Sequence, residues 1–459
     1  MKKSIILLFI VTVLCSRSFG QPITSFVSLS QHVSNTGIVF GGSILYDKTI
    51  GMYPQKAVSC YEGVISGERR GVITIVKDTM SAKSYVLYPQ ILVRDMVQSG
   101  FSDRVCFCGA RWDPVLHDSI GVMGYMVIDA AGILQSMNYI DVAEVGVLTD
   151  LVRVMSSGRE VIVSIGQKEY NSTRQNYVVK GYESSYTNTW EYDVAPLSDK
   201  YITDIVSTDD YVAIVSTDLI HNLRLRRFNV MNLDDAMKDV LYEYPLSENI
   251  EFSPEATFLG REEVDAGENR IALVHSGLKN DMYWHMFLKV MDLSTMGMTN
   301  AQSHHLYEKN YPIDITYLSE KKTVAVLDFF DPDYTAVNPT VVLFKPDELT
   351  NYVYYKFYYD DMLYWHSLSK LCETPAGASF YLCGGVYGAD KYYHIHNVGS
   401  LSYDQCVDSH EIAIDRDERV EYTALPSPLQ FTHNLSLLQD ALCVERIDLI
   451  NAFCQYPNE

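Results

Sequence analysis

The chain has 459 residues, with 58 Asp and Glu against 36 Lys and Arg and a formal net charge of −22 at pH 7. A surface this acidic repels phosphate backbones and anionic lipid headgroups, so the composition argues against nucleic-acid binding and against docking on anionic membranes. The length exceeds one ordinary core of about 150 residues, which favours a repeat whose units pack only against their neighbours.

The first 20 residues have the order of a secretory signal peptide. Two lysines precede an apolar run over 5–14, and small residues stand at positions 18 and 20. The run is about ten residues and too short to span a bilayer, and no later stretch reaches 18 apolar residues. We therefore expect cleavage after Gly20 and export of a chain without a transmembrane segment to the periplasm or cell surface. Lipid attachment at Cys15 is the alternative.

Cysteine usage also favours export. Without Cys15 the mature chain holds eight cysteines, an even number that allows up to four disulfides. We expect at least two disulfides, with Cys372–Cys383 as the first choice because a separation of eleven positions suits two neighbouring strands. Zinc binding is disfavoured because Cys106-Phe107-Cys108 lacks the two-residue spacer of common structural sites. The eight cysteines are Cys60, Cys106, Cys108, Cys372, Cys383, Cys406, Cys443 and Cys454.

From about residue 90 onward, short apolar runs alternate with polar turns at a regular period. Asp95, Asp150, Asp204 and Asp314 each open a unit, at intervals of 55, 54 and 110 residues. Each unit continues with a second apolar strand, a third strand and a less regular fourth. Four short antiparallel strands per unit is the arrangement of a propeller blade. The sequence therefore predicts an all-β fold, a single β-propeller over 21–459 with about seven four-stranded blades, six or eight remaining open.

The predicted blades follow from this period. They cover 45–94, 95–149, 150–203, 204–258, 259–313, 314–367 and 368–430, with 431–459 as a C-terminal closing segment. Over residues 90–390, an Asp-aliphatic strand followed by an apolar strand ending in Gly or Cys-Gly resembles secreted, largely uncharacterised propeller-like repeat proteins of Bacteroides-type bacteria. The resemblance implies an architecture and an exported location, and it implies no activity.

The recurring aspartates allow two interpretations. If each opening strand is the innermost of its blade, the four carboxylates occupy equivalent positions around a central channel. In the structural interpretation each one accepts backbone N–H groups from a neighbouring loop and fixes the register between blades. In the other interpretation they converge on a hard cation such as calcium. The structural interpretation is favoured because three of the seven predicted units lack the Asp.

The stretch 352–366 is rich in aromatic side chains, and four of them are our candidates for ligand binding: Tyr354, Tyr355, Tyr359 and Trp365. Exposed aromatic faces stack on sugar rings or anchor protein partners. The structural alternative, favoured on the pattern alone, is packing between strands and between blades.

We predict no cofactor and assign no metal site, with calcium as the one alternative left open. His394 and His396 share one face of a predicted strand, which a solvated face explains as well as a metal site. Asp328, Asp331 and Asp333 fall in a predicted loop that lacks the glycine turn and distal glutamate of an EF-type calcium loop.

No catalytic motif stands out, so no catalytic residue is assigned. The sequence contains no Gly-x-Ser-x-Gly, no His-Glu-x-x-His and no phosphate-binding glycine loop. We expect a non-enzymatic binding or scaffolding propeller that recognises a glycan or protein partner. The alternative is a carbohydrate-active enzyme, a hydrolase or lyase with carboxylates at one end of the channel, which two carboxylates facing one aromatic-lined pocket would favour. A structural subunit of a surface assembly is a third interpretation.

Overall fold

The computed structural model describes residues 25–28, 40–47, most of 56–398 apart from short connecting segments, and five short strands between 407 and 447. The described elements are all β-strands. Among these residues there is no apolar helix long enough to cross a membrane. The predicted all-β fold class is thereby confirmed, whereas the predicted signal segment 1–20 lies outside the described residues.

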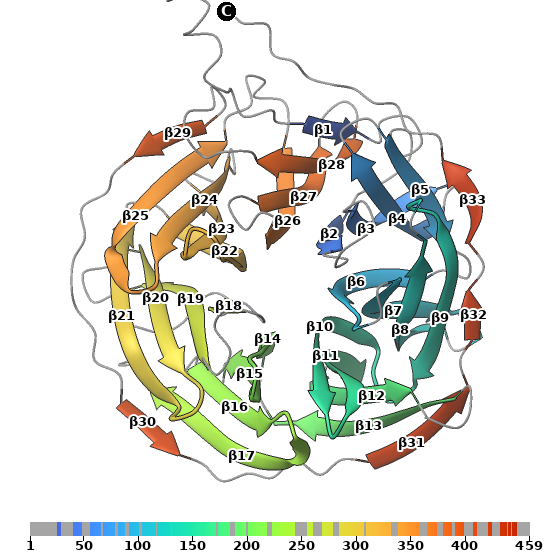
Figure 1. The fold of residues 1–459 in the computed structure, drawn as a ribbon, viewed down its shortest axis with the longest axis horizontal. Coiled ribbons are helices and arrows are strands. Elements are labelled where there is room, and N and C mark those ends of the chain that lie inside the picture. Colours follow the sequence, from blue (N-terminus) through green and yellow to red (C-terminus); the bar gives the residue numbers. More distant parts are fainter. Residues whose placement is uncertain are drawn as a thin grey trace, which may run out of the picture.

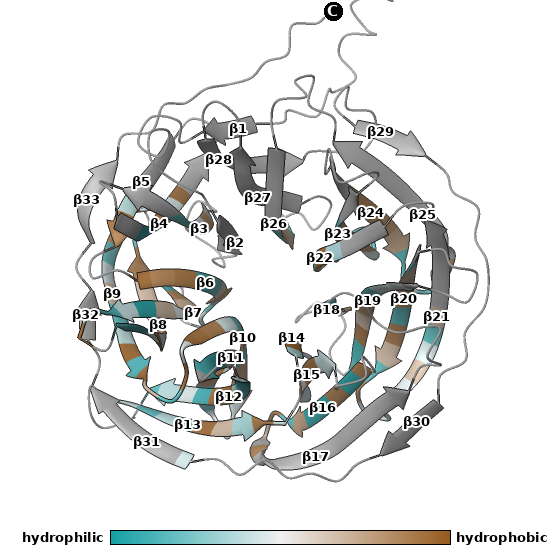
Figure 2. Cartoon of the chain, turned by 180° about the vertical axis from the view of Figure 1, so that it is seen from behind, coloured by the Kyte–Doolittle hydropathy of each residue, from teal (hydrophilic) through white to brown (hydrophobic). Residues whose placement is uncertain are grey.

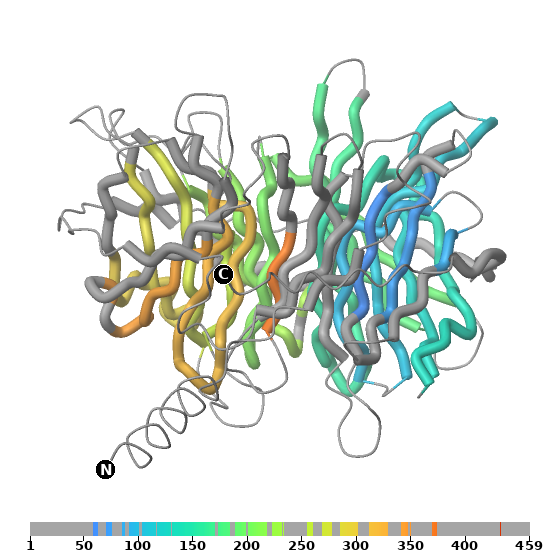
Figure 3. The backbone as a smooth tube through the Cα atoms, turned by 90° about the horizontal axis from the view of Figure 1, so that it is seen from above, coloured from blue at the N-terminus to red at the C-terminus, as the bar shows by residue number. Residues whose placement is uncertain are grey.

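The described strands form seven antiparallel sheets, which stand in a ring around a central axis (Figure 1). Within each sheet, strands that are consecutive in the chain lie side by side from the axis outward. Seen from the side, the strands run up and down between the two faces of the ring (Figure 3). The innermost strands β2 and β26 contact each other, so the first and the seventh sheet are neighbours.

Each sheet takes its main strands from one segment of the chain. The first three sheets are β2 (Phe40–Asp47), β3 (Lys56–Ile65), β4 (Glu68–Asp78) and β5 (Ser81–Leu87); β6 (Ile91–Gln98), β7 (Arg104–Asp113), β8 (Asp118–Ile128) and β9 (Leu134–Val142); and β10 (Val147–Ser156), β11 (Arg159–Tyr170), β12 (Thr173–Glu183) and β13 (Thr189–Leu197). The fourth and fifth are β14 (Tyr201–Ser207), β15 (Tyr211–Thr217), β16 (Leu223–Asn229) and β17 (Asn232–Glu243); and β18 (Glu255–Phe258), β19 (Arg270–Leu278), β20 (Trp284–Asp292) and β21 (Gly297–Leu306). The last two are β22 (Lys309–Leu318), β23 (Thr323–Asp331), β24 (Asn338–Lys345) and β25 (Glu348–Phe357); and β26 (Trp365–Glu373), β27 (Phe380–Tyr387) and β28 (Lys391–Val398).

The two ends of the chain supply outer strands to six of the seven sheets. The N-terminal strand β1 (Ser25–Ser28) pairs with β28 and gives the seventh sheet its fourth strand. The C-terminal part runs around the outside, where Figure 1 shows its strands in red, and adds a fifth strand to five sheets. These strands are β29 (Val407–His410) on β25, β30 (Glu421–Ala424) on β17, β31 (Thr432–Leu437) on β13, β32 (Gln439–Ala441) on β9 and β33 (Cys443–Ile447) on β5. The described strands β31, β32 and β33 of the closing segment expected over 431–459 are therefore outer strands of three different sheets, and β29 and β30 before it are outer strands of two more.

The hydrophobic cores lie between neighbouring sheets. Along β7, Val105 and Phe107 pack toward the first sheet, whereas Cys106 and Cys108 pack toward the third. Successive side chains of a strand point to opposite faces, so a strand covered on both faces needs an uninterrupted apolar run. Hydrophobic and hydrophilic residues alternate more clearly along strands such as β16 (Figure 2). Among the described residues five such clusters join the first six sheets in succession, so no sheet has a core of its own.

The sheets begin before the positions at which the predicted units open. The second sheet starts at Ile91 and the third at Val147, whereas the predicted units start at Asp95 and Asp150. The seventh sheet takes 365–398 together with β1, in place of the predicted 368–430. The reason is that the recurring Asp lies in the middle of an innermost strand and not at its beginning.

The predicted disulfide between Cys372 and Cys383 is wrong, because Cys372 is a thiol in the structure. The strand register pairs Cys372 with Tyr381 and Cys383 with Lys370, so the two cysteines are diagonal neighbours on adjacent strands. Diagonal neighbours have Cα atoms about 7–8 Å apart, beyond the reach of a disulfide.

Three other cysteines, Cys60, Cys106 and Cys108, are buried thiols. The side chains of Cys383, Cys406, Cys443 and Cys454 lie outside the described residues. The expectation of at least two disulfides is therefore limited to pairs among these four cysteines.

Candidate functional site

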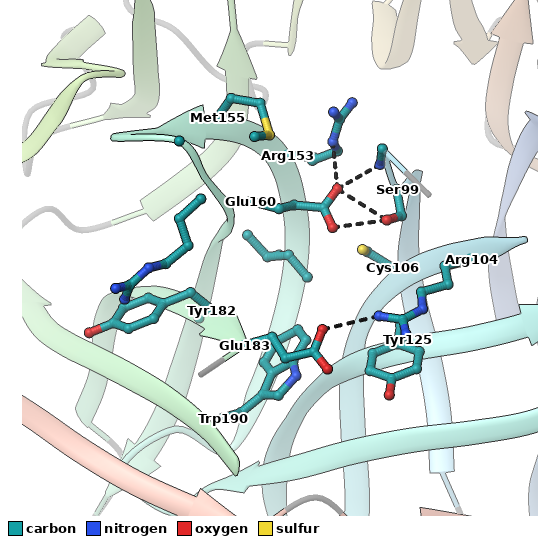
Figure 4. Close-up of a pocket in the computed structure, with 15 residues that line it drawn as sticks. Ser99, Arg104, Cys106, Tyr125, Arg153, Met155, Glu160, Tyr182, Glu183 and Trp190 are labelled. Atoms are coloured by element: carbon teal, nitrogen blue, oxygen red, sulfur yellow. Dashed lines mark hydrogen bonds and ion pairs between the residues drawn. The ribbon is translucent and has the colours of Figure 1, made fainter. Parts of the chain in front are cut away.

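A cavity of about 730 Å³ lies between the second and the third sheet (Figure 4). Its volume falls within the range of about 300–1,000 Å³ that is usual for small-molecule sites. Strands β7 and β8 line it on one side and β10 to β13 on the other. We call it the inter-sheet pocket. Its aromatic residues are Tyr125, Tyr182 and Trp190, and its charged residues are Arg104, Arg153, Arg159, Glu160 and Glu183.

The third sheet presents one face to this pocket, and strand register decides which residues belong to that face. In the β10–β11 hairpin, Met155 is paired with Glu160 and Arg153 with Ile162, and all four residues line the pocket. The two-residue turn of this hairpin has Ser157 at φ 51° and Gly158 at φ 76°. Positive φ at both central residues is typical of a type I′ turn, which holds the two strands in this register.

Next along this face, β12 has a glycine that lines the pocket. Gly181 pairs with Ile162 on the neighbouring strand and lines the cavity. A Cβ atom there would lie 2.7 Å from Met123 Sδ and 3.2 Å from Trp190 Cζ3, so either side chain would have to shift. Glycine at this position leaves room for both side chains.

Glu160 is fixed by three groups on one side of the pocket. Its carboxylate lies 2.7 Å from the Arg153 Nε and accepts a 2.7 Å hydrogen bond from the Gly100 backbone N–H. The Ser99 Oγ lies 2.9 Å from Glu160 Oε2. The ion pair with Arg153 and the charge-assisted hydrogen bonds from Gly100 and Ser99 hold the Glu160 carboxylate in place.

Arg104 and Glu183 form a second ion pair at 3.0 Å on the opposite side. The Arg104 guanidinium carbon lies 4.4 Å from the centroid of the Tyr125 ring, within the range of a cation–π interaction. The Trp190 ring lies beside the Tyr125 ring, with their centroids 6.2 Å apart and an interplanar angle of 31°. Together these residues make an aromatic wall edged by a charged pair, as Figure 4 shows.

Two polar groups of the inter-sheet pocket have no partner within the part of the chain that the structure describes. Trp190 is 3% exposed, and its indole N–H meets no hydrogen-bond acceptor there. Arg159 is exposed, and its guanidinium carbon lies 5.1 Å from the Tyr182 ring centroid with no carboxylate of the described chain in ion-pair range. A buried donor without an acceptor costs about 1–3 kcal/mol, so the Trp190 N–H is a polar group for which the described chain supplies no compensation.

Cys106 also lines the inter-sheet pocket, but it is poorly suited to act as a nucleophile. Burial, followed by the nearby Glu160 carboxylate, raises the pKa of its thiol well above the usual range. The thiolate is the reactive form of cysteine. This side chain therefore contributes apolar surface to the pocket.

The predicted aspartates Asp95, Asp150, Asp204 and Asp314 lie elsewhere, on the innermost strands. All four are buried at equivalent positions, each directly after a β-bulge that leaves the preceding residue without a cross-strand partner. By strand register, Glu255 and Lys370 take the same position in β18 and β26. We call these six residues the carboxylate ring.

Three of the ring carboxylates each connect one sheet to the next. Asp95 accepts a hydrogen bond from the Leu151 N–H at 3.3 Å, and Asp204 accepts one from the Ala256 N–H at 2.5 Å. Asp314 accepts one from the Leu371 N–H. In each case the donor is the residue that follows the ring position of a neighbouring sheet. This is the arrangement of the structural interpretation, except that the N–H groups come from innermost strands and not from loops.

Lys370 places a positive charge among the ring carboxylates. Its Nζ lies 3.4 Å from Asp314. Burial acts to lower the pKa of Lys370, but the carboxylates of Asp314, Asp150, Asp95 and Glu255 outweigh it and hold that pKa well above its ordinary value. The chain itself thus supplies the cation that faces these acids.

The same surroundings make the ring acids hold protons more tightly. Burial, opposed by Lys370, raises the pKa of Asp150 to about 7. Burial also raises the pKa of Asp204 and of Asp314 above their ordinary values. The neighbouring carboxyls of Asp95 and Asp204 also affect the pKa of Asp150.

Neither the predicted calcium alternative nor the predicted aromatic cluster gains support. Within the described side chains no group of three or more His, Cys, Asp or Glu is arranged to hold a metal ion. Tyr354 and Tyr355 are in β25, an outer strand of the sixth sheet, whereas Trp365 begins β26, the innermost strand of the seventh. The backbone thus does not bring these three residues together, and Tyr359 lies outside the described residues. The side chains of His394, His396, Asp331 and Asp333 also lie outside the described residues. Asp328, expected in a loop, is buried in strand β23.

No family model and no curated protein matches the sequence. Among solved structures, one described as the crystal structure of an ACO/RPE65 chimera aligns with 86% of this chain and 97% of its own, with a TM-score of 0.33 and 9% sequence identity. At that TM-score the likeness carries no inference about the function of this chain.

Proposed function

We propose that the chain is a seven-bladed β-propeller, each sheet being one blade, and that it is a non-enzymatic binding protein whose inter-sheet pocket takes a glycan. Support for the propeller comes from the ring of seven antiparallel sheets, whose innermost strands β2 and β26 contact each other. Export to the periplasm or cell surface rests on the leader-like sequence alone and stays a prediction.

The observation that carries the binding function is the partnerless N–H of Trp190 beside an aromatic wall. Sugar rings offer apolar faces that stack on aromatic side chains and hydroxyl oxygens that accept hydrogen bonds. Trp190 and Tyr125 supply the aromatic surface, and the indole N–H supplies a donor that the described chain does not use. Two ion pairs, Arg153–Glu160 and Arg104–Glu183, border this aromatic surface and hold the two glutamates in place.

An enzyme is the second candidate, since two carboxylates, Glu160 and Glu183, line the same aromatic pocket. Glycosidases use such a pair, one carboxylic acid to protonate the leaving group and one carboxylate as base or nucleophile. Here each carboxylate is engaged by an arginine, and Glu160 by Ser99 and Gly100 as well. These contacts occupy both oxygens of Glu160 and one oxygen of Glu183, which favours binding without catalysis.

A glycan array tests the proposal. Trp190→Phe keeps an aromatic ring but removes the N–H, and it should weaken retention of any bound glycan about fivefold or more. Trp112→Phe is the matched control, because Trp112 is 43% exposed and is not part of the pocket lining. Equal retention by the parent and by the Trp190 variant would place the binding site elsewhere. Release of shorter sugars from a retained glycan would favour the enzyme.

A further inference from the structure

We propose that the ligand of the inter-sheet pocket is an acidic sugar, a pyranose with a carboxylate that Arg159 binds. This inference rests on the proposed glycan-binding function and narrows it to one chemical class of ligand.

The charge of the pocket is the first argument. The chain as a whole carries a formal charge of −22, yet three arginines and two glutamates line this pocket. Arg104 is paired with Glu183 and Arg153 with Glu160. Arg159 is left as the cation without a carboxylate among the described residues, so the pocket has one positive charge that a ligand anion can neutralise.

The position of Arg159 is the second argument. It follows the tight Ser157–Gly158 turn, and its guanidinium lies 5.1 Å from the centroid of the Tyr182 ring. Stacking on an aromatic face leaves the N–H groups at the guanidinium edge available as donors. A carboxylate matches this edge, because its two oxygens accept two parallel hydrogen bonds from one guanidinium.

The third argument is the combination of this cation with the Trp190 side of the pocket. Trp190 offers a buried N–H and lies beside Tyr125, which suits a ring with hydroxyl groups. A small free carboxylate would use only Arg159, and a neutral sugar would use only the Trp190 side. A uronic-acid type of sugar uses both, and the cavity of about 730 Å³ has room for such a ring and its neighbour in a chain.

The test uses two probes that differ in one group: methyl β-D-glucuronide, with a carboxylate at C6, and methyl β-D-glucoside, with a hydroxymethyl group there. Binding to the full chain is measured for both by NMR titration. We expect the glucuronide to bind about fivefold more tightly, since an ion pair at an exposed site contributes up to about 1 kcal/mol. Arg159→Gln should reduce its affinity to that of the glucoside.

Arg174→Gln is the matched control. Arg174 is exposed on the same sheet, its guanidinium carbon lies 5.7 Å from the Tyr201 ring centroid, and it is not part of the pocket lining. This variant should keep the preference for the glucuronide.

If the parent binds the two probes with equal affinity and Trp190→Phe binds neither, the acidic-sugar inference is overturned and the glycan-binding function stands. Failure of both probes, while the array retains another glycan, would overturn this inference alone. Failure of both probes together with an array that retains nothing would overturn the proposed function as well.

Discussion

The carboxylate ring and the inter-sheet pocket are both rich in charged side chains, but they satisfy those charges in opposite ways. In the ring, Asp95, Asp204 and Asp314 each accept the N–H of an innermost strand in another sheet, and Lys370 supplies the counter-charge. In the pocket, the Trp190 N–H and the Arg159 guanidinium are donors for which the described chain provides no acceptor.

The difference indicates which region holds the fold together and which region binds a ligand. Polar groups that are buried with all their partners fix one arrangement of the chain, whereas a buried donor without a partner stabilises nothing until an acceptor arrives. Substitutions in the ring should therefore change stability, and substitutions at the two donors of the pocket should change binding.

A large loss of stability is expected for Lys370→Met. Removing one member of a buried ion pair costs about 3–5 kcal/mol, and because the Lys370 side chain is 24% exposed we expect roughly 2–3 kcal/mol less stability in urea unfolding. The exposed Lys321→Met is the control and should change stability by less than about 0.5 kcal/mol. A Lys370 variant as stable as the parent would show that the ring needs no counter-charge.

A smaller loss is expected for Asp204→Asn. The amide keeps the shape of the side chain but weakens the charge-assisted hydrogen bond from the Ala256 N–H, which should cost about 1–3 kcal/mol. Urea unfolding with and without added calcium measures the effect. Melting of the parent that depends on calcium, and that the substitution abolishes, would instead favour the cation interpretation of the ring.

Asp150 should give the protein a dependence of stability on pH. In the folded protein the pKa of Asp150 is raised to about 7, against about 3.9 in an unfolded chain. The folded state binds this proton more tightly, so the stability it contributes is complete below about pH 4 and is lost as the pH rises through about 7.

The measurement is the difference in unfolding free energy between the parent and Asp150→Asn from pH 4 to 8. The parent's advantage should shrink by about 2–4 kcal/mol up to about pH 7 and then stay constant. The exposed Asp118→Asn should show no such trend. An advantage of the parent that grows with rising pH would contradict the raised pKa.

The smallest effect on stability is expected for Arg159→Gln. Arg159 is exposed and forms no ion pair among the described residues, so the free energy of unfolding should change by less than about 0.5 kcal/mol. The same protein sample should show the loss of glucuronide binding. A large loss of stability would mean that this arginine belongs to the fold as the ring does.

The sequence predicted the ring but not the pocket, and the reason is geometric. The ring residues recur at one position of a regular repeat, so Asp95 and Asp150 can be aligned without knowing any contact. Glu255 and Lys370 were not predicted because they occupy the same position of the repeat but are not aspartates. The outer strands β29 to β33 were also not predicted. They have three to six residues each, add to the edges of existing sheets and follow no period of their own.

The pocket residues were missed because they are spread over 99–190 and meet only through the packing of one sheet on another. The one local signal was the pair Arg153 and Glu160 on either side of Ser157–Gly158, where a hairpin places opposite charges on the same face. The aromatic stretch that contains Tyr354 and Tyr355 gave a stronger pattern, but aromatic density says nothing about which strands face each other.

The most direct test of the account compares two methionine methyl groups by NMR while the glycan retained on the array is titrated into the full chain. Met155 lines the inter-sheet pocket, whereas Met96 is buried next to Asp95 in the ring strand β6. We predict that the Met155 resonance shifts in proportion to binding while the Met96 resonance stays in place. A shift of Met96 with Met155 unchanged would contradict the assignment of binding to the pocket and of structure to the ring.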